Sequence, residues 1–227
     1  MSRTLAACLA AALLATACGR QEPSPESLTV GREPGASSGE LFSPDDLGVL
    51  EGPDRDEWQQ PDRTMDELAI ADGARVADIG AGGGWFTVRL AHRVGPNGVV
   101  YAEDIQPEMI GAIERRVSRE GLANVQTILG TTSDPRLPEA LDAVLIVDAY
   151  PQFDEPVAML RQVADALAPG GRLGIVDFTK DGAGGPGPPL EDRLDPAQVV
   201  KDAAEAGLRL ERHHTFLRYQ YLLVFSK

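Results

Sequence analysis

The sequence predicts an α/β fold, with a doubly wound sheet of seven strands that is mostly parallel and carries helices on both faces. Short apolar runs alternate with segments of helical periodicity, and five of these runs have the character of parallel strands. They begin near Val76, Val99, Val125, Val144 and Leu173. Two further runs, 208–213 and 219–225, indicate a closing strand pair. One strand near the edge of the sheet should therefore be antiparallel.

The first strand ends in a glycine-rich turn that leads directly into a helix. Asp78 closes the strand, and Gly80, Gly82 and Gly84 make the turn. Glycine has no Cβ, so the backbone can approach a ligand closely at these positions. A helix is expected over 85–94, because apolar residues recur there at helical spacing. The pattern indicates a nucleotide-type site, and a tight turn with a helix-capping aspartate is the alternative.

The second strand ends in two acidic residues. An acidic residue about 20 positions after the glycines accepts hydrogen bonds from ribose hydroxyls, and Asp104 follows Gly84 by 20 residues. We prefer Asp104 to Glu103, because alternation along the strand turns Glu103 to the same face as Tyr101. Asp104 also suits the N-cap of a helix that begins near Pro107, and the two roles are compatible.

The next two strands bring further polar residues to the same edge of the sheet. The loop 130–138, which contains Asp134, follows the third strand. The fourth strand, 141–148, is apolar almost throughout, as a parallel strand buried on both faces should be. Asp148 and Tyr150 fall at its carboxyl end, where open α/β sheets bind ligands.

Together these segments resemble the class I S-adenosylmethionine-dependent methyltransferases over about residues 55–225. The turn has the pattern G-x-G-x-G with Asp78 two residues ahead, similar to motif I of that family. The segment 104–109 resembles its D-x-x-P-E-M stretch, and 167–171 looks like the L-x-P-G-G turn before its fifth strand. The resemblance implies a Rossmann-like fold and S-adenosylmethionine as the cofactor.

The resemblance also implies which residues meet the cofactor. The implied set is Asp78, Gly80, Gly82, Gly84, Asp104, Ile105, Asp134 and Asp148. Asp78 would lie near the methionine end and act on the ammonium through backbone amides or water. Asp134 would meet the adenine amino group, and a turn-forming aspartate before proline is the alternative. Trp58 lies in a segment that resembles part of a bacterial subgroup of these enzymes, where it would cover the cofactor pocket or pack a helix onto the sheet.

A nicotinamide dehydrogenase is a further alternative that the sequence disfavours. Its fingerprint G-x-G-x-x-G would require glycine at the position of Trp85. A carboxylate at Asp78 would also repel an anionic pyrophosphate, whereas it suits a cofactor that carries a sulfonium and an ammonium.

Composition restricts the partners. The chain has 227 residues, a formal net charge of −14 and an isoelectric point near 4.6. An acidic surface repels phosphate backbones and anionic lipid, so we expect no nucleic-acid substrate and no electrostatic docking to membranes. Both cysteines lie in the first 18 residues, so we expect no disulfide in the domain. No histidine–carboxylate cluster has metal-ligand spacing, so we expect no metal.

The N-terminus resembles a bacterial lipoprotein signal over residues 1–18. Arg3 precedes an apolar stretch that is too short to span a bilayer, and Cys18 follows it. We expect lipid attachment at Cys18, a disordered Pro/Gly/Ser/Glu-rich tether over 19–54, and a methyltransferase-like domain over 55–227. The protein would then lie in the cell envelope. A plain secretory signal and a misassigned start upstream of a cytoplasmic enzyme are the alternatives.

The expected reaction is methyl transfer to an acceptor of small or medium size, whose identity is unknown. Several relatives carry histidine just after the tyrosine of the fourth strand and again before an arginine in the loop after the fifth. Here Pro151 and Gln152 stand at the first place and Asp192 at the second. We therefore assign no catalytic residue, and Asp148 and Tyr150 remain the candidates. These departures and the signal support a second hypothesis, a membrane-tethered binding module that has lost the reaction.

Overall fold

The computed structural model describes residues 41–180 and 185–227. The predicted signal with Cys18, and the predicted tether as far as residue 40, lie outside these residues. From residue 41 the chain contains η1, a 3-10 helix over Pro44–Glu51 that the Ser43 side chain caps. Regular structure therefore begins inside the segment 19–54 that we expected to be disordered. The N-cap and the proline in the first turn favour this short helix.

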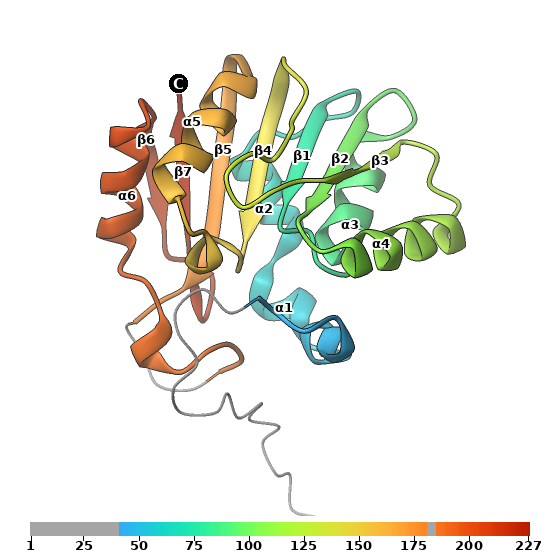
Figure 1. Cartoon of the computed structure of the whole chain (residues 1–227), viewed down its shortest axis with the longest axis horizontal. Coiled ribbons are helices and arrows are strands. Elements are labelled where there is room, and N and C mark those ends of the chain that lie inside the picture. The colour runs from blue at the N-terminus through green and yellow to red at the C-terminus, as the bar shows by residue number, and fades with distance from the viewer. Residues whose placement is uncertain (1–40, 181–184) are drawn as a thin grey trace, which may run out of the picture. The chain divides into compact units, whose positions relative to one another are not determined.

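The seven predicted strands form one sheet in the order β3-β2-β1-β4-β5-β7-β6 (Figure 1). They are β1 (Arg75–Ile79), β2 (Val99–Asp104), β3 (Val125–Leu129), β4 (Leu141–Val147), β5 (Leu167–Phe178), β6 (Arg209–His214) and β7 (Gln220–Ser226). β7 runs antiparallel to β5 and β6, and the other neighbours pair in parallel. The predicted fold is confirmed. Strand order reverses between β1 and β4, where open sheets of this kind form their binding crevice.

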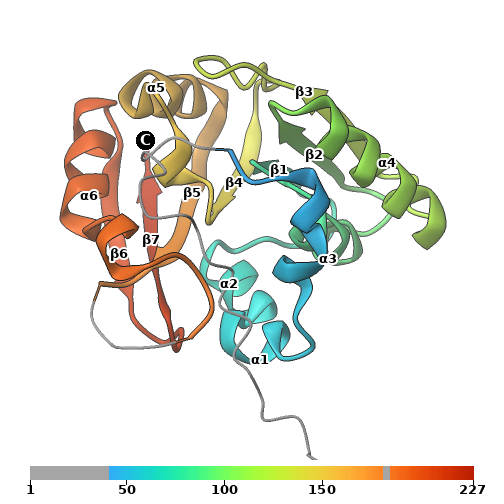
Figure 2. The ribbon, with the colours of Figure 1, turned by 60° about the horizontal axis from the view of Figure 1, so that its bottom comes forward.

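Helices cover both faces of the sheet (Figures 1 and 2). They are α1 (Arg55–Gln59), α2 (Pro61–Glu67), α3 (Trp85–Val94), α4 (Pro107–Glu120), α5 (Pro156–Ala166) and α6 (Pro196–Glu205). α5 and α6 share a buried cluster with Ile146 and Ile175 on one face, and α2 and α3 share another with Leu145 and Val176. α4 packs beside α3 against β2 and β3. In the described part of the chain, no helix has the length and apolar character needed to cross a membrane.

Local sequence explains where the helices begin and end. α3 starts after Gly84, whose φ is +77°, and stops at Gly95, whose φ is +62°. α4 starts at Pro107. Gln106, and not Asp104, takes its N-cap position, because Asp104 is still the last residue of β2. The capping role that we considered for Asp104 is therefore wrong, and its carboxylate remains at the strand end.

β5 begins earlier than predicted. Leu167 already pairs with Leu141, the register then shifts, and pairing resumes where Arg172 meets Ala143. Gly170, with a φ of +82°, lies in the interruption and accommodates the detour that an L-residue resists. The segment 167–171, predicted as a turn before the strand, is therefore an irregular first part of it.

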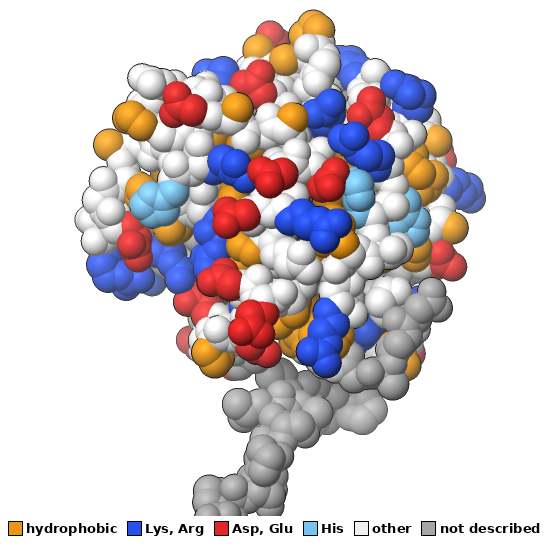
Figure 3. Space-filling view, turned by 180° about the vertical axis from the view of Figure 1, so that it is seen from behind, with side chains coloured by type: hydrophobic (Ala, Val, Ile, Leu, Met, Phe, Trp, Pro, Cys, Tyr) orange, Lys and Arg blue, Asp and Glu red, His pale blue; other side chains and the backbone are white. Residues whose placement is uncertain are grey.

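The surface behind the view of Figure 1 carries charges of both signs. Lys and Arg side chains lie interspersed with Asp and Glu side chains over this face (Figure 3). Mixed charge of this kind differs from the single-sign basic stripe that recognition of a nucleic-acid backbone uses.

Candidate functional site

A cavity opens at the carboxyl ends of β1, β2 and β4, the edge that Figure 2 turns toward the viewer. Its walls come from the glycine turn (80–83), the end of β2 and the next residues (103–106), the loop after β3 (131–132), the end of β4 (147–149) and parts of 41–55. The cavity thus lies at the point where strand order reverses. Six of the eight residues predicted to meet a cofactor line it, and Gly84 and Asp134 do not.

The glycine turn has the geometry that its residue types predict. Gly80 and Gly82 have φ values of +65° and +55°, in the left-handed region that favours glycine. A Cβ on Gly80 would lie 2.5 Å from the Cβ of Ala149, so alanine cannot replace it without displacing the end of β4. Gly84 instead serves as the N-cap of α3, behind the cavity wall. Two of the three glycines therefore shape the cavity, and the third starts the helix.

Asp78 is a buried carboxylic acid at the end of β1. Its side chain is 2% exposed, and its Oδ2 accepts a hydrogen bond of 2.6 Å from the Thr87 hydroxyl. Burial raises the pKa of Asp78 to about 6, while the Thr87 bond and the Arg55 charge oppose the rise. A cationic group in the cavity would favour its ionised form. Asp78 is thus suited to an ammonium-bearing ligand.

Asp104 is fixed by backbone amides. The N–H of Gly82 donates to its Oδ2 over 2.9 Å, and the N–H of Gln106 donates to its Oδ1 over 3.0 Å. Burial raises the pKa of Asp104, and these amide bonds oppose that shift. Each carboxylate oxygen can accept a second bond, so the group can also bind a diol. Ile105 follows it along the same wall.

Asp134 forms the local turn that was the alternative to a contact with adenine. Its side chain is exposed, and Oδ1 accepts from the Arg136 amide over 2.7 Å. The Thr131 amide donates to the Asp134 carbonyl over 2.9 Å, which closes the loop on itself. Thr131 and Thr132, and not Asp134, reach the cavity.

Asp148 lies at the end of β4 with a left-handed φ of +56°. Its two oxygens accept from the amide side chains of Gln59, over 3.3 Å, and Gln220. Burial raises the pKa of Asp148 to about 6, against the Arg55 charge and the two amide bonds. A carboxylate with such a pKa is ionised at neutral pH and can still take up a proton.

Tyr150, the other catalytic candidate, faces away from the cavity. It is 2% exposed, and its hydroxyl donates to Asp202 Oδ2 over 3.0 Å. Burial and the neighbouring carboxylate raise its pKa. The three histidines are also elsewhere, because His92 and His213 are exposed and His214 contacts Glu67 over 3.2 Å. Of the two catalytic candidates, Asp148 is therefore the one that lines the cavity.

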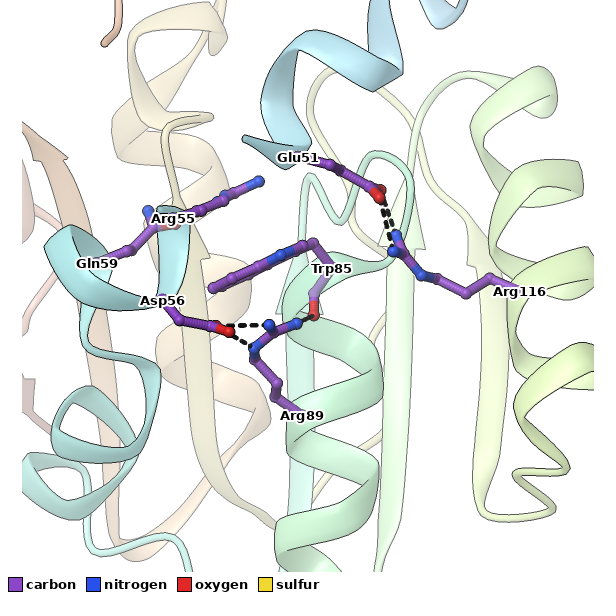
Figure 4. Close-up of polar contacts among 7 residues, drawn as sticks. All are labelled: Glu51, Arg55, Asp56, Gln59, Trp85, Arg89 and Arg116. Carbon is purple, nitrogen blue, oxygen red and sulfur yellow. Dashed lines mark hydrogen bonds and ion pairs between the residues drawn. The ribbon is translucent and has the colours of Figure 1, made fainter. Parts of the chain in front are cut away.

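Residues within 41–55 form one wall of the cavity, whereas the sequence had offered only Trp58 as a cover. Trp58 does not line the cavity, and its ring lies beside those of Phe178 and Tyr219. Arg55 lines the cavity, is 8% exposed, and donates from Nε to the side-chain carbonyl of Gln59. Its guanidinium lies 4.2 Å from the centre of the Trp85 ring, and that of Arg89 lies 3.4 Å from it. Figure 4 shows the indole between the two cations. The stack anchors α1 to α3.

Two ion pairs complete the attachment of this segment. Asp56 pairs with Arg89 over 2.5 Å, and Glu51 pairs with Arg116 (Figure 4). Arg116 also donates to the Gly83 carbonyl over 2.9 Å. The Asp56–Arg89 pair is largely exposed and adds little stability by itself. Together with the indole stack, the pairs fix η1 and α1 beside the glycine turn.

Glu103 also lines the cavity, although the sequence favoured Asp104 over it. Its Oε2 accepts from the Gly80 amide over 3.4 Å. Burial raises the pKa of Glu103 to about 8, and nearby carboxylates add to the rise. Among the described residues, no cluster of three or more histidine, cysteine, aspartate or glutamate side chains could hold a metal ion.

Comparison with known proteins agrees with this geometry. Residues 76–171 match the family described as methyltransferase domain. An uncharacterised methyltransferase of Mycobacterium tuberculosis is 38% identical over 123 residues, 53% of this chain and 46% of the relative. Nocamycin O-methyltransferase of Saccharothrix syringae is 32% identical over 114 residues, 50% of this chain and 41% of the relative. The chain thus spans about half the length of the curated relatives it matches.

A solved structure covers more of the chain. It is an S-adenosylmethionine-dependent methyltransferase from Aquifex aeolicus, with a TM-score of 0.77 and 27% identity. The alignment covers 82% of this chain and 98% of that one. The fold of residues outside 76–171 therefore also has a counterpart among methyltransferases.

Proposed function

We propose that this chain, whose residues 76–171 match the methyltransferase domain family, is an S-adenosylmethionine-dependent methyltransferase that acts on a small or medium-sized acceptor. The observation that carries the proposal is the set of buried acids and one guanidinium around a cavity at the switch point of the sheet. Such a set complements a ligand with a diol, an ammonium and a carboxylate.

Each end of the cofactor has residues that suit it. Asp104 would accept the ribose hydroxyls, because backbone amides hold both its oxygens in place. Asp78 would lie toward the ammonium and Arg55 toward the carboxylate of the methionine part. Gly80 and Gly82 would let the ligand approach the backbone closely. S-adenosylmethionine supplies the methyl group on a sulfonium, which leaves as a neutral thioether.

The residues of this chain mainly position the acceptor, because the leaving group is already activated. An oxygen or nitrogen acceptor also gives up a proton, and we assign its capture to Asp148. Gln59 and Gln220 hold that carboxylate at the carboxyl end of β4, and its pKa of about 6 suits a base at neutral pH. The charge of Arg55, which also lines the cavity, acts on the same carboxylate and favours its ionised form.

The second hypothesis, a tethered binding module without transfer, keeps one supporting observation. None of the three histidines lines the cavity, so no imidazole takes the place of the two that the family resemblance leads us to expect. A module of this kind would bind the cofactor or its demethylated product and transfer nothing.

We also propose a location. The N-terminal pattern of Arg3, an apolar stretch and Cys18 supports lipid attachment at Cys18 and residence in the cell envelope. The anchored protein would then meet only acceptors on that side of the membrane. A cytoplasmic enzyme with a misassigned start remains the alternative location.

Calorimetry with S-adenosylmethionine and S-adenosylhomocysteine tests the binding half of the proposal. We expect both to bind in the micromolar range, and absence of binding up to millimolar concentration would reject it. Incubation of methyl-tritiated cofactor with extracts of the cell envelope and of the cytoplasm tests the transfer half. Labelled product in either extract supports the enzyme, whereas binding without label supports the module.

A further inference from the structure

Glu103 is a buried carboxylic acid whose second oxygen has no partner. The side chain is 1% exposed and lines the cavity. Oε2 accepts from the Gly80 amide over 3.4 Å, but Oε1 has no hydrogen-bond partner among the described residues. A buried polar atom without a partner costs free energy on the order of 1–3 kcal/mol, and the side chain that carries this atom lines the cavity, where a bound ligand would supply the partner.

The surroundings are built to hold this carboxyl group. A Cβ on Gly130, the residue that follows β3, would lie 1.8 Å from Oε1 and 2.9 Å from the carboxyl carbon. Any larger residue at position 130 would push the side chain out of its place. The carboxyl group of Glu103 therefore sits in a space that glycine keeps open, between the ends of β1 and β3.

The residues around Glu103 indicate which part of the ligand would reach Oε1. Asp104, the next residue along β2, is the proposed ribose ligand, so the group attached to the ribose lies close by. The cavity lining includes Ile105, Phe153 and Met159, which offer apolar surface. A heteroaromatic base suits such a wall. Asp134 cannot serve it as placed, because its carboxylate is turned into its own loop.

We propose that Glu103 Oε1 donates a hydrogen bond to a ring nitrogen of the cofactor purine, and that this residue selects the base. This inference rests on the proposed function, because it requires that an adenosine-containing cofactor occupies the cavity. Oε2 already accepts from an amide, which leaves Oε1 as the oxygen that carries the proton.

The protonation state agrees with that assignment. Burial raises the pKa of Glu103 to about 8, so the acid is mostly neutral at pH 7. The charged groups that act on it are Asp104 on the same strand, Asp78 on β1 and Asp134 beyond β3, and all three raise its pKa further. Above pH 8 the carboxylate forms, cannot donate, and repels the lone pair of a ring nitrogen.

The test compares purine analogues in three proteins. S-adenosylhomocysteine and its 1-deaza, 3-deaza and 7-deaza analogues are titrated calorimetrically into wild type, Glu103→Leu and Glu103→Gln at pH 7. We expect wild type to bind one deaza analogue about tenfold more weakly than the parent, the loss of one hydrogen bond. Glu103→Leu should bind that analogue and the parent equally, and Glu103→Gln, whose amide can donate, should keep the preference.

A pH series adds a readout that a structural role would not change. The preference of wild type should disappear between pH 7 and 9.5, and that of Glu103→Gln should not. Asp134→Asn is the matched control and should keep the wild-type preference at pH 7.

Three outcomes separate the possibilities. If wild type binds S-adenosylhomocysteine but shows no preference among the analogues, or if Glu103→Leu retains the preference, the assignment to Glu103 is wrong and the cofactor proposal stands. If Asp134→Asn alone loses the preference, the loop carboxylate reads the base instead. If wild type binds none of the compounds, the proposed function is wrong and this inference fails with it.

Discussion

Gly82 donates its backbone N–H to Oδ2 of Asp104 over 2.9 Å, which ties the turn after β1 to the end of β2. The bond links the two elements that enclose a nucleoside in the proposed function. It also fixes the direction of the carboxylate, because the Gln106 amide restrains the other oxygen. A group held by two backbone amides is preorganised for binding, since little side-chain entropy remains to be lost.

Asp104→Ala should therefore weaken binding of S-adenosylhomocysteine by about 1.5–3 kcal/mol, or roughly 10- to 150-fold, as expected when a charged hydrogen-bond partner is removed. Calorimetry measures the change. Asp134→Ala is the matched control and should stay within about twofold of wild type, because that side chain does not line the cavity. A larger effect at position 134 than at 104 would contradict the assignment of the ribose.

Arg55→Gln should discriminate between ligands with and without a carboxylate. We expect about tenfold or greater loss of affinity for S-adenosylhomocysteine, because a charge-assisted hydrogen bond is lost. Affinity for 5′-methylthioadenosine, which lacks the amino-acid part, should change by less than about threefold. Arg63→Gln is a suitable control, since Arg63 also stacks on an aromatic ring, Phe216, but lies outside the cavity. Equal losses for both ligands would show that Arg55 acts through folding of the wall.

The rate of methyl transfer should depend on pH through Asp148. Its pKa is raised to about 6, so below pH 6 the group is protonated and cannot accept a proton. The rate should rise about tenfold per pH unit up to pH 6 and level off above pH 7. Asp148→Asn should lower the rate at pH 7.5 by about 10²–10⁴-fold and abolish this dependence. Tyr150→Phe, which loses only the bond to Asp202, should remain within about threefold of wild type.

Cys18→Ser should release the protein from the membrane fraction. Lipid attachment needs the thiol, and the acidic domain has little affinity of its own for anionic lipid. Cys8→Ser is the matched control and should leave the protein membrane-bound. Fractionation with mass spectrometry of the N-terminus measures both. A wild-type protein that is soluble and begins with Met1 would reject the signal and support a cytoplasmic enzyme.

The sequence predicted the sheet and the meeting of Asp78, Asp104 and Asp148 for the same reason. Parallel strands end at one edge, so acids that terminate β1, β2 and β4 converge there whatever the details of the loops. Asp134 was harder to place, because an aspartate before proline in a loop can either form a local turn or contact a distant ligand. In the structure the local turn holds its carboxylate.

Other site residues depended on contacts between distant parts of the chain. Alternation along β2 turned Glu103 away from the face of Asp104, yet both residues line the cavity, and alternation gave no sign that Gly130 leaves room for a carboxyl group there. Arg55 belongs to a short helix whose place is set by Trp85 and Arg89, 30 or more residues later in the chain. Neither arrangement has a local signature that periodicity or spacing could reveal.

The attachment of η1 bears on where the domain can be cut. A shortened protein that begins at Arg55, the boundary that composition suggests, would retain every strand of the sheet. It would lose Leu47, which packs near Gly83, and Glu51, the partner of Arg116. Such a protein could fold well and still bind its ligand weakly, because one side of its cavity would be missing. The smallest piece with an intact cavity therefore includes residues that lie before Arg55 and well before residues 76–171, which match the family.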